Sequence, residues 1–372
     1  MKQQMVFQYH CTFVTPSDDR SMGHTLGESM DKPIVAITMG DAAGIGPEIT
    51  IKALRNQYLY DSCTPFIIGD IAIMQDAAQL VDKSLQVTEV ESVDAVRGDY
   101  GKLEILNLGG IDRSKLLMGK VDPMCGKAAV EYTIRAGQLA LENRIDAVVS
   151  APLNKESMRA AGYKYEGATE IFGTLAGSKL YGMLLLLDTF RLMLFTTHMS
   201  LIDACRAVKK DKLLQKIRLC HEGMELFKLP RMHIAVSALN PHAGEGGLFG
   251  REEVEEIVPA IEAARGEGID VVGPIPSDTV FVRAYKGEFD IVIALFHDQG
   301  NMAMKLLGFG SVVTLLVGIP FIRTSVGHGT AFDIAGKNIA DATNLTKAVE
   351  EAAKLAQKLR HNKCVPVPLH TI

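Results

Sequence analysis

Short runs of valine and isoleucine alternate with helix-length amphipathic segments, and this alternation constrains the fold more than any other feature. The apolar runs cover residues 34–38, 66–69, 103–106, 146–150, 233–238, 290–295 and 312–317. The helical patterns cover residues 47–56, 71–81, 126–143, 212–227, 252–265 and 344–359. Because strands that are separated by helices pair in parallel, the alternation predicts an α/β protein with a largely parallel sheet.

The chain is long enough to form two lobes. It has 372 residues, of which 47% are hydrophobic and 22% are charged, an ordinary composition for a globular protein with substantial cores. No segment rich in proline, glycine or serine divides it, and it contains no internal repeat. We therefore expect two lobes that share strands, with domains that are discontinuous in sequence.

Residues 1–30 differ from the rest of the chain. They are polar and irregular, and they lack the basic start and apolar core of a secretory signal. We predict that they form a disordered extension, or that the start of the chain is mis-called. The two histidines of this segment, His10 and His24, are for that reason not counted as ligands.

The longest apolar stretch, residues 183–195, contains Asp188 and Arg191. A segment this short and this charged cannot cross a membrane as a helix. The pattern predicts two strands that are joined by a turn at residues 188–189.

Charge and cysteine content exclude several classes of protein. A net charge of -5 gives no basic surface for nucleic acid. The six cysteines form no CxxC pair, which is typical of reduced thiols in a cytoplasmic protein and disfavours a thiolate zinc site. We expect a cytoplasmic protein with neither a nucleic-acid partner nor a membrane partner.

Two glycine-rich segments are candidates for binding loops. Residues 40–48, Gly-Asp-Ala-Ala-Gly-Ile-Gly-Pro-Glu, follow the first strand and open a helix, with Pro47 suited to its first turn. Their spacing differs from the G-x-G-x-x-G of a Rossmann phosphate loop, which leaves an ordinary strand–helix turn or a family-specific site loop. Residues 325–337 could wrap an adenine or a pyrophosphate, or could be an ordinary loop.

Three histidines follow apolar runs and are candidate metal ligands. His198 lies three residues after the run of residues 183–195, His242 follows residues 233–238, and His297 follows residues 290–295. Ligand sites gather at the carboxyl ends of strands in α/β sheets, and imidazole suits zinc and similar divalent ions. Hydrogen-bonded structural histidines, or a catalytic histidine without metal, are the alternatives.

Three cations lie near the same kinds of position. Lys155, Lys305 and Arg323 follow predicted strand ends, where they could bind an anionic group of a substrate. Arginine can hold a carboxylate or phosphate through two parallel hydrogen bonds, whereas lysine acts as a point charge.

These segments together resemble the 4-hydroxythreonine-4-phosphate dehydrogenase family of pyridoxal phosphate biosynthesis and its catabolic relatives, such as terephthalate cis-dihydrodiol dehydrogenase. The resemblance extends over residues 33–348. It rests on the Gly-Asp-Ala-Ala-Gly-Ile-Gly-Pro-Glu motif, Leu-Asn-Pro-His-Ala-Gly-Glu-Gly-Gly, His-Asp-Gln-Gly and Gly-Ile-Pro-Phe-Ile-Arg-Thr-Ser. It implies a two-lobed fold similar to isocitrate and isopropylmalate dehydrogenases, with a cleft between the lobes. It also implies a homodimer that uses NAD and a divalent metal.

The resemblance assigns roles to individual residues. His198, His242 and His297 become the metal ligands, one of them from the partner subunit, and Asp278 and Asp298 become the supporting carboxylates. The cofactor-binding residues are Gly327, His328, Gly329, Thr330, Asp333, Ile334 and Gly336. The cofactor-side lobe then comprises residues 31–152 and 315–372, and the metal, substrate and dimerisation lobe comprises residues 153–314.

The chain departs from the family at its phosphate site. Ala168 stands where a substrate-binding histidine is expected, and Thr314 where an asparagine is expected, while Thr169, Lys305 and Arg323 match. This departure leaves two substrate classes open. One is a small hydroxy acid with a phosphate, and the other is an aromatic cis-dihydrodiol carboxylate.

The resemblance implies a metal-assisted dehydrogenase. The metal, zinc first and otherwise magnesium, manganese or cobalt, would polarise the substrate hydroxyl so that hydride can pass to NAD, and the keto acid formed could lose carbon dioxide. Lys155 is the candidate for proton transfer. The non-enzymatic alternative is a sensor that binds a metabolite without turning it over.

Overall fold

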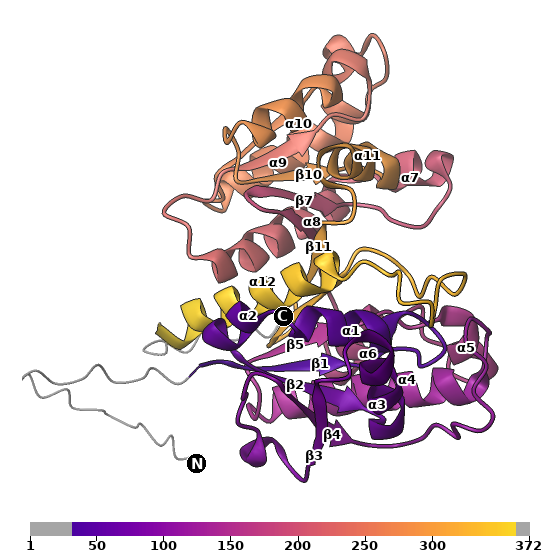
Figure 1. Ribbon diagram of the computed structural model, residues 1–372. Helices are drawn as coiled ribbons and strands as arrows, with labels where there is room; N and C mark the ends of the chain where they lie inside the picture. Colours follow the sequence, from indigo (N-terminus) through magenta and orange to yellow (C-terminus); the bar gives the residue numbers. More distant parts are fainter. Residues whose placement is uncertain (1–31, 362–372) are drawn as a thin grey trace, which may run out of the picture. The chain divides into compact units, whose positions relative to one another are not determined.

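The computed structural model describes residues 32–361, which form one continuous unit. The expected extension of residues 1–30, with His10 and His24, lies outside the described residues. The described strands form a single twelve-stranded sheet in the order β3-β4-β2-β1-β5-β12-β11-β6-β7-β10-β8-β9 (Figure 1). The predicted α/β class with a largely parallel sheet is therefore confirmed.

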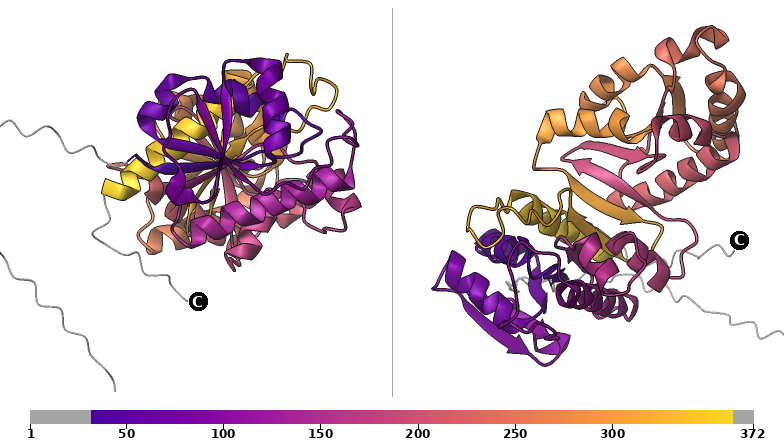
Figure 2. Two further views of the ribbon diagram at one scale, coloured as in Figure 1. Left: turned by 60° about the horizontal axis from the view of Figure 1, so that its bottom comes forward. Right: turned by 90° about the vertical axis from the view of Figure 1, so that its right-hand side faces the viewer.

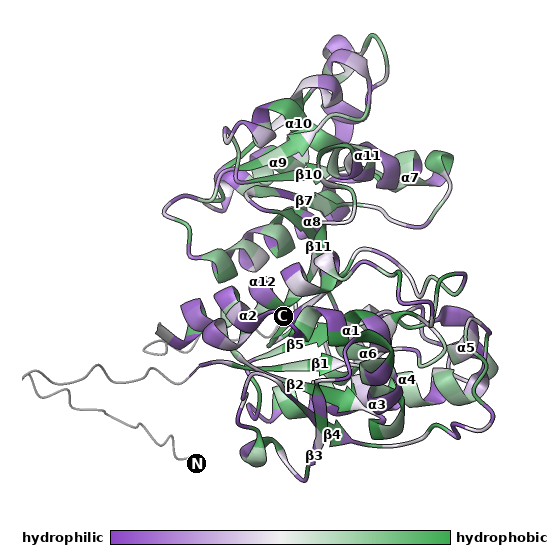
Figure 3. Ribbon diagram, viewed as in Figure 1, coloured by the Kyte–Doolittle hydropathy of each residue, from purple (hydrophilic) through white to green (hydrophobic). Residues whose placement is uncertain are grey.

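The strands are short and most are apolar. They are β1 (Ile34–Thr38), β2 (Thr64–Gly69), β3 (Gln86–Val90), β4 (Lys102–Asn107), β5 (Ala147–Ser150), β6 (Gly182–Leu187), β7 (Phe190–Leu194), β8 (Ile234–Ser237), β9 (Val271–Ile275), β10 (Ile291–Ala294), β11 (Val313–Val317) and β12 (Ile322–Val326). Figure 3 shows hydrophobic residues concentrated along the strands, whereas the helices carry both hydrophobic and hydrophilic residues. This distribution is expected of strands that are covered on both faces.

The α-helices lie between the strands along the chain. They are α1 (Gly46–Leu54), α2 (Gln57–Ser62), α3 (Ile71–Val81), α4 (Pro123–Leu141), α5 (Lys155–Ala160), α6 (Ala168–Leu175), α7 (Leu201–Ala207), α8 (Lys210–Met224), α9 (Val258–Gly266), α10 (Ser277–Tyr285), α11 (His297–Gly308) and α12 (Thr343–His361). Short 3-10 turns occur at η1 (Val93–Ala95), η2 (Glu225–Phe227) and η3 (Pro241–Gly247), and a π-helical turn, η4 (Glu253–Ile257), precedes α9. None of the described helices is long and apolar enough to span a membrane.

Two blocks of parallel strands run in opposite directions along the sheet. Strands β3, β4, β2, β1, β5 and β12 are mutually parallel, and so are β7, β10, β8 and β9. Antiparallel pairings of β12 with β11, β11 with β6 and β6 with β7 join the blocks. An odd number of reversals separates β12 from β7, so the carboxyl ends of the two blocks point to opposite edges of the sheet.

Helices cover both faces of the first block. The side chains of consecutive strand residues point to opposite faces. Arg323 on β12 lies against Phe172 of α6, whereas the hydroxyl of its neighbour Thr324 donates to the Ala348 carbonyl of α12 at 2.8 Å. The two helices therefore lie on opposite faces, and Figure 2 likewise shows α4 on one side of the strands with α1 and α3 on the other.

Most of the predicted elements are present, and several short ones were not predicted. The two strands expected within residues 183–195 are β6 and β7, and Asp188 occupies the turn between them with φ 51°. The strands β3, β9 and β12 and the helices α2, α5, α6, α7, α10 and α11 have no counterpart in the expected runs. None of these nine elements is longer than 12 residues, and β3 is mostly exposed. Apolar periodicity is weakest in such segments.

The glycine-rich loop after β1 is a tightly packed turn with a buried carboxyl group. Gly40 has φ 75°, and a Cβ atom there would lie 2.3 Å from the Pro152 carbonyl oxygen. The Asp41 side chain is fully buried; its Oδ1 accepts from the Ala43 amide at 2.9 Å, and its Oδ2 has no partner among the described residues. Pro47 occupies the first turn of α1, as predicted.

Burial raises the pKa of Asp41 to about 6. The Ala43 amide and the Ser157 hydroxyl act in the opposite direction, and the nearby Asp122 carboxylate raises the pKa further. The thiol of Cys125 on α4 also lies close to the Asp41 carboxyl group. Between about pH 4 and 6 the folded protein therefore retains a proton that the unfolded chain has released.

This pKa shift predicts a pH-dependent stability. Because the folded state binds the extra proton, the contribution of Asp41 to the free energy of unfolding falls as the pH rises from 4 to 6. Asp41→Asn keeps the acceptor for the Ala43 amide and cannot ionise. The free energy of unfolding of the variant minus that of the parent should therefore be larger at pH 7 than at pH 4, by up to about 3 kcal/mol. Urea unfolding of both proteins at each pH measures this, and Asp61→Asn on α2 controls for the lost charge. An equal difference between Asp41→Asn and the parent at both pH values would contradict it.

Candidate functional site

Two of the predicted metal ligands lie together at the carboxyl ends of adjacent strands. His198 follows β7 and His297 opens α11 directly after β10, which is parallel to β7. Their ring centroids are 5.7 Å apart. Nδ1 of His297 lies 2.7 Å from Oδ1 of Asp298, and this contact would orient the ring and leave Nε2 available as a ligand.

His242 lies on an unusual loop after β8, the strand that pairs with β10 on its other side. Five consecutive residues from His242 to Gly246 have positive φ values. The loop packs on the buried Glu253, whose carboxylate accepts from the amides of Leu239 and Asn240 at 2.9 and 2.7 Å. The imidazole itself is 68% exposed, and its Nδ1 lies 3.8 Å from the Glu245 carboxylate. The exposed His242 side chain is thus held by a loop whose backbone conformation is high in energy.

The described residues of one chain do not complete a metal site. No group of three or more His, Cys, Asp or Glu side chains within residues 32–361 is placed to hold an ion. The His198–His297 pair supplies two imidazoles of a suitable kind, whereas His242 contacts neither ring in the described contacts. Asp278 lies in the first turn of α10 with an exposed side chain, next to Ser277, whose hydroxyl accepts from the Gln299 side chain at 2.9 Å. Two imidazoles suit a divalent ion such as zinc but do not by themselves complete its coordination.

A buried arginine is the most distinctive charged group of the first block. Arg323 on β12 is 4% exposed, and its Nε donates to the Ser150 hydroxyl at 3.1 Å. Its guanidinium lies over the Phe172 ring of α6, 5.5 Å from the centroid, and makes no ion pair with any described residue. Burial lowers the pKa of Arg323 to about 10, so the group remains a cation at neutral pH. A buried cation without a counter-ion is well placed to bind an anion.

Hydroxyl groups surround this arginine on the same face of the sheet. Thr314 on β11 pairs with Ser325 on β12, and their hydroxyl oxygens are 2.5 Å apart. Met183 on β6 shares this face and lies 3.6 Å from the hydroxyl of Thr169, in the first turn of α6. The structure therefore gathers three of the predicted substrate residues, Thr169, Thr314 and Arg323, around one face.

Ala168 is buried at the start of α6 and adds no polar group to this face. Two residues of the same face were not predicted. Ser150 ends β5 and binds Arg323, and Ser325 holds the Thr314 hydroxyl. Ser150 could be recognised as a polar residue at the end of an otherwise apolar strand, whereas the signal for Ser325 was its place two positions after an arginine.

The two predicted lysines are exposed and lie apart from Arg323 in the described contacts. Lys155 opens α5, and Lys305 lies in the last turn of α11. The structure of a single chain therefore shows neither the desolvated base expected at Lys155 nor the second cation expected beside Arg323. Both roles remain predictions.

The predicted cofactor segment follows β12 and lies against the glycine-rich loop. The Ile45 amide donates to the Thr330 carbonyl at 3.0 Å, and a Cβ atom on Gly44 would lie 2.9 Å from the Thr330 Cβ. The parallel order β1-β5-β12 brings these two loops to the same edge of the sheet. Of the other predicted residues, Ile334 is half-buried, whereas Gly327, His328, Gly329, Asp333 and Gly336 are exposed. Exposed backbone groups on a supported loop fit a nucleotide site.

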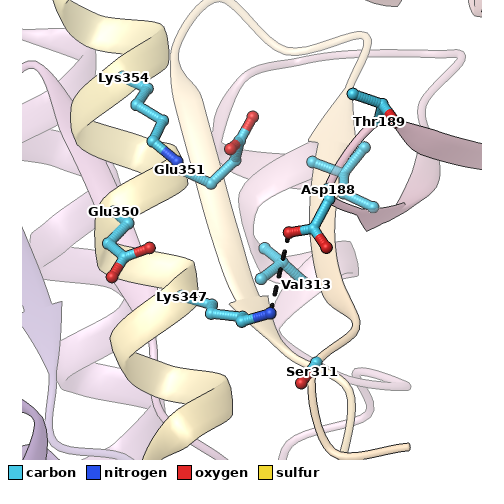
Figure 4. Close-up of a pocket in the computed structure, with 9 residues that line it drawn as sticks. Asp188, Thr189, Ser311, Val313, Lys347, Glu350, Glu351 and Lys354 are labelled. Atoms are coloured by element: carbon cyan, nitrogen blue, oxygen red, sulfur yellow. Dashed lines mark ion pairs between the residues drawn. The ribbon is translucent and has the colours of Figure 1, made fainter. Parts of the chain in front are cut away.

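A separate pocket of about 310 Å³ lies between the β6–β7 turn and α12. Figure 4 shows the Lys347 ammonium pointing at the Asp188 carboxylate, 3.8 Å away. Asp188 precedes β7 whereas His198 follows it, so the pocket lies at the other end of this strand from the histidine pair. No predicted site residue lines it.

Comparison with known proteins assigns the chain to a family. Residues 61–352 match the family described as "Pyridoxal phosphate biosynthetic protein PdxA". The chain is 42% identical over 327 residues to the D-threonate 4-phosphate dehydrogenase of Cupriavidus necator, covering 88% of this chain and 98% of the relative.

Two solved structures of named dehydrogenases are also similar. The 4-hydroxythreonine-4-phosphate dehydrogenase of Klebsiella pneumoniae is 36% identical with a TM-score of 0.82, covering 87% of this chain and all of that one. The terephthalate 1,2-cis-dihydrodiol dehydrogenase of Burkholderia xenovorans is 27% identical with a TM-score of 0.60, covering 86% and 97%. These names support an oxidoreductase. The resemblance seen in the sequence is thereby confirmed, and the chain belongs to the PdxA family.

Proposed function

We propose that this protein oxidises and decarboxylates a four-carbon hydroxy acid with a terminal phosphate, using NAD and a divalent metal. D-threonate 4-phosphate and 4-phosphooxy-threonine are the substrates that its relatives suggest. The buried Arg323, which has no counter-ion among the described residues, is the observation that carries this proposal. A phosphate would supply the missing negative charge and accept two parallel hydrogen bonds.

The hydroxyl groups beside Arg323 support a phosphate at this face. Ser150 and Thr169 can each donate to a phosphate oxygen without adding a charge, and so can whichever hydroxyl of Thr314 and Ser325 accepts the hydrogen bond between them. Thr314 stands in place of an amide, so the Thr314–Ser325 pair takes over the polar role at this position. A site that is built of one cation and several hydroxyls can hold a phosphate without the histidine that Ala168 replaces.

A second substrate class has one observation in its favour. Ala168 is apolar and buried where a phosphate-binding histidine was expected, and the aromatic dihydrodiol dehydrogenase of Burkholderia xenovorans is a relative of this fold. An aromatic carboxylate could use Arg323 alone. We place this class second because that relative is 27% identical and the D-threonate 4-phosphate relative is 42% identical.

We infer further that the protein is a homodimer whose metal site is shared between subunits. Each histidine segment is followed by exposed apolar side chains, and a patch of this kind on a protein surface is typical of an interface. They are Leu201 and Ile202 after His198, Leu248 and Phe249 after His242, and Met302 and Leu306 after His297, each between 49% and 87% exposed. Burying these side chains against a second copy would bring an additional histidine to the His198–His297 pair.

The residues of this chain would then have distinct tasks. His198, His242 and His297 would hold the metal, and Asp298 would keep the ring of His297 in place. When bound, a zinc, magnesium, manganese or cobalt ion would polarise the substrate oxygens, and NAD would accept the hydride. Arg323 would fix the phosphate end of the substrate, and Lys155 would transfer the proton. The four described cysteines are free thiols, which supports a cytoplasmic location.

A substrate panel tests the reaction. We expect NADH formation, followed by absorbance, with D-threonate 4-phosphate or 4-phosphooxy-threonine in the presence of a divalent metal. Threonate without phosphate should react at least about 100-fold less efficiently, because Arg323 would be left unpaired. Faster turnover of an aromatic dihydrodiol carboxylate would favour the second class. Tight binding of a panel member with no NADH formed at all would favour the metabolite sensor.

Replacing the buried arginine tests the phosphate site. Arg323→Lys keeps the charge but loses the paired hydrogen bonds, so KM for the phosphorylated substrate should rise about 10- to 100-fold. Arg191→Lys is the matched control, because Arg191 also lies on a strand and over a phenylalanine ring, 4.7 Å from the Phe227 centroid. We expect the control to lower the melting temperature while KM stays within about twofold of the parent. Equal KM changes in the two variants would argue against the site.

Mixed dimers test the shared metal site. His242→Ala and His297→Ala should each lose metal and activity as homodimers. If the two histidines of one site come from different subunits, coexpression of the variants gives heterodimers with one intact site, and about a quarter of the parent activity and metal content returns. Each variant purified by the same route serves as control. Coexpressed protein that contains heterodimers but remains inactive would rule out this sharing.

A further inference from the structure

The last residue of the glycine-rich motif makes contacts that the proposed chemistry does not use. Glu48, in the first turn of α1, is 3% exposed. Its Oε1 accepts from the Ala340 amide at 2.9 Å, and its Oε2 lies 3.3 Å from the Asn338 amide. These two amides belong to the backbone that leaves the predicted cofactor segment, almost 300 residues further along the chain.

Lys52 completes a closed set of contacts, one helical turn after Glu48. Its Nζ lies 2.8 Å from Glu48 Oε1 and also donates to the Ala340 carbonyl at 2.8 Å. Ala340 is therefore held through both its amide and its carbonyl by an ion pair of which only 3% of Glu48 and 19% of Lys52 are exposed. A mostly buried pair of this kind is stronger and more directional than one at the surface.

Two side chains of this segment make further hydrogen bonds: Asn338 Nδ2 donates to the Leu80 carbonyl at 3.1 Å, and the Lys337 ammonium donates to the Asp333 carbonyl at 2.6 Å. Lys337, Asn338 and Ile339 are exposed, and Asn338 has φ 57°, a conformation that few side chains favour. At the other end of the segment, Thr330 is held by the Ile45 amide. The glycine-rich motif thus binds the predicted cofactor segment at two points, Thr330 and Ala340, with the exposed Asp333 and Gly336 between them.

We propose that Glu48 is a positioning residue for nucleotide binding, and that Glu48 and Lys52 form a clamp on residues 338–340. The clamp fixes the loop from Thr330 to Ala340 in one conformation before NAD binds, and so reduces the entropy that is lost on binding. This inference rests on the proposed NAD site at residues 327–336. It assigns the Gly-Pro-Glu end of the motif to the cofactor and not to the substrate.

The test compares Glu48 with a matched carboxylate. Glu104 on β4 is also buried, at 8% exposure, and accepts from the amides of Arg97 and Gly98 at 2.7 to 3.0 Å, in a loop far from the cofactor segment in the described contacts. The variants are Glu48→Ala, Glu48→Gln and Glu104→Ala. Glu48→Gln retains an acceptor for the Ala340 amide and guards against a variant that does not fold. The readouts are melting temperature, NADH affinity by fluorescence titration, hydrogen exchange of residues 327–340, and kcat with both KM values.

Glu48→Ala should weaken NADH binding and raise KM for NAD about tenfold, which corresponds to about 1.4 kcal/mol. KM for the hydroxy acid should stay within about twofold, and exchange of residues 327–340 should accelerate. Glu48→Gln should recover part of the affinity. Glu104→Ala should lower the melting temperature but leave NADH affinity unchanged.

Two results would overturn the clamp. One is an unchanged NADH affinity in Glu48→Ala, and the other is an equal loss in Glu48→Ala and Glu104→Ala. A parent protein that binds no NADH would instead remove the proposed cofactor, and the role of the clamp with it. These failures are distinguishable, because the parent protein binds NADH in the first two cases and does not bind it in the third.

Discussion

The parallel pairing of β12 with β5 is the interaction on which the rest of the structure depends. It joins residues that are about 175 positions apart, with Ser325 opposite Ser150 and Arg323 opposite Val148. Closing so long a loop costs conformational entropy, which the sheet hydrogen bonds and the burial of β12 on both faces must offset. Once formed, the pairing places Arg323 beside Ser150 and the segment after Val326 beside the glycine-rich loop. The sheet face around Arg323 and the proposed cofactor site both depend on the register of this one strand pair.

The sequence predicts elements well where their apolar pattern is strong. The run of residues 34–38 and the helix of residues 71–81 coincide with β1 and α3. It predicts β12 poorly because Ile-Arg-Thr-Ser-Val has three consecutive polar residues between two apolar ones and therefore no apolar run. Its polar residues are buried in pairs with partners on other strands and helices, such as Thr314 and Ala348. Tertiary pairing of this kind cannot be read from local pattern.

The same limit applies to the candidate site. The three histidines could be identified from their places after strands, and the structure puts two of them together. The glycine-rich motif could be recognised but its task could not, because the contacts of Glu48 reach Asn338 and Ala340 across almost the whole chain. Ser150 and Ser325 were missed for a similar reason. A serine at a strand end indicates a binding site only when a neighbouring strand places an arginine beside it.

The direction of the strands explains why one chain holds the parts of a site without assembling them. The histidines follow β7, β8 and β10, whereas the cofactor segment and the glycine-rich loop follow β12 and β1, and the two blocks run in opposite directions. Twist across the intervening β11 and β6 can turn the blocks toward one another, but it cannot supply a third ligand to His198 and His297. In the proposed dimer a second copy would supply that ligand, because a two-fold interface can bring the His242 segment of each subunit to the His198–His297 pair of the other. If the proposed dimer forms, the exposed side chains of Leu306 and Leu248 serve the reaction as well as the interface, since burying them would bring the remaining imidazole to the metal site.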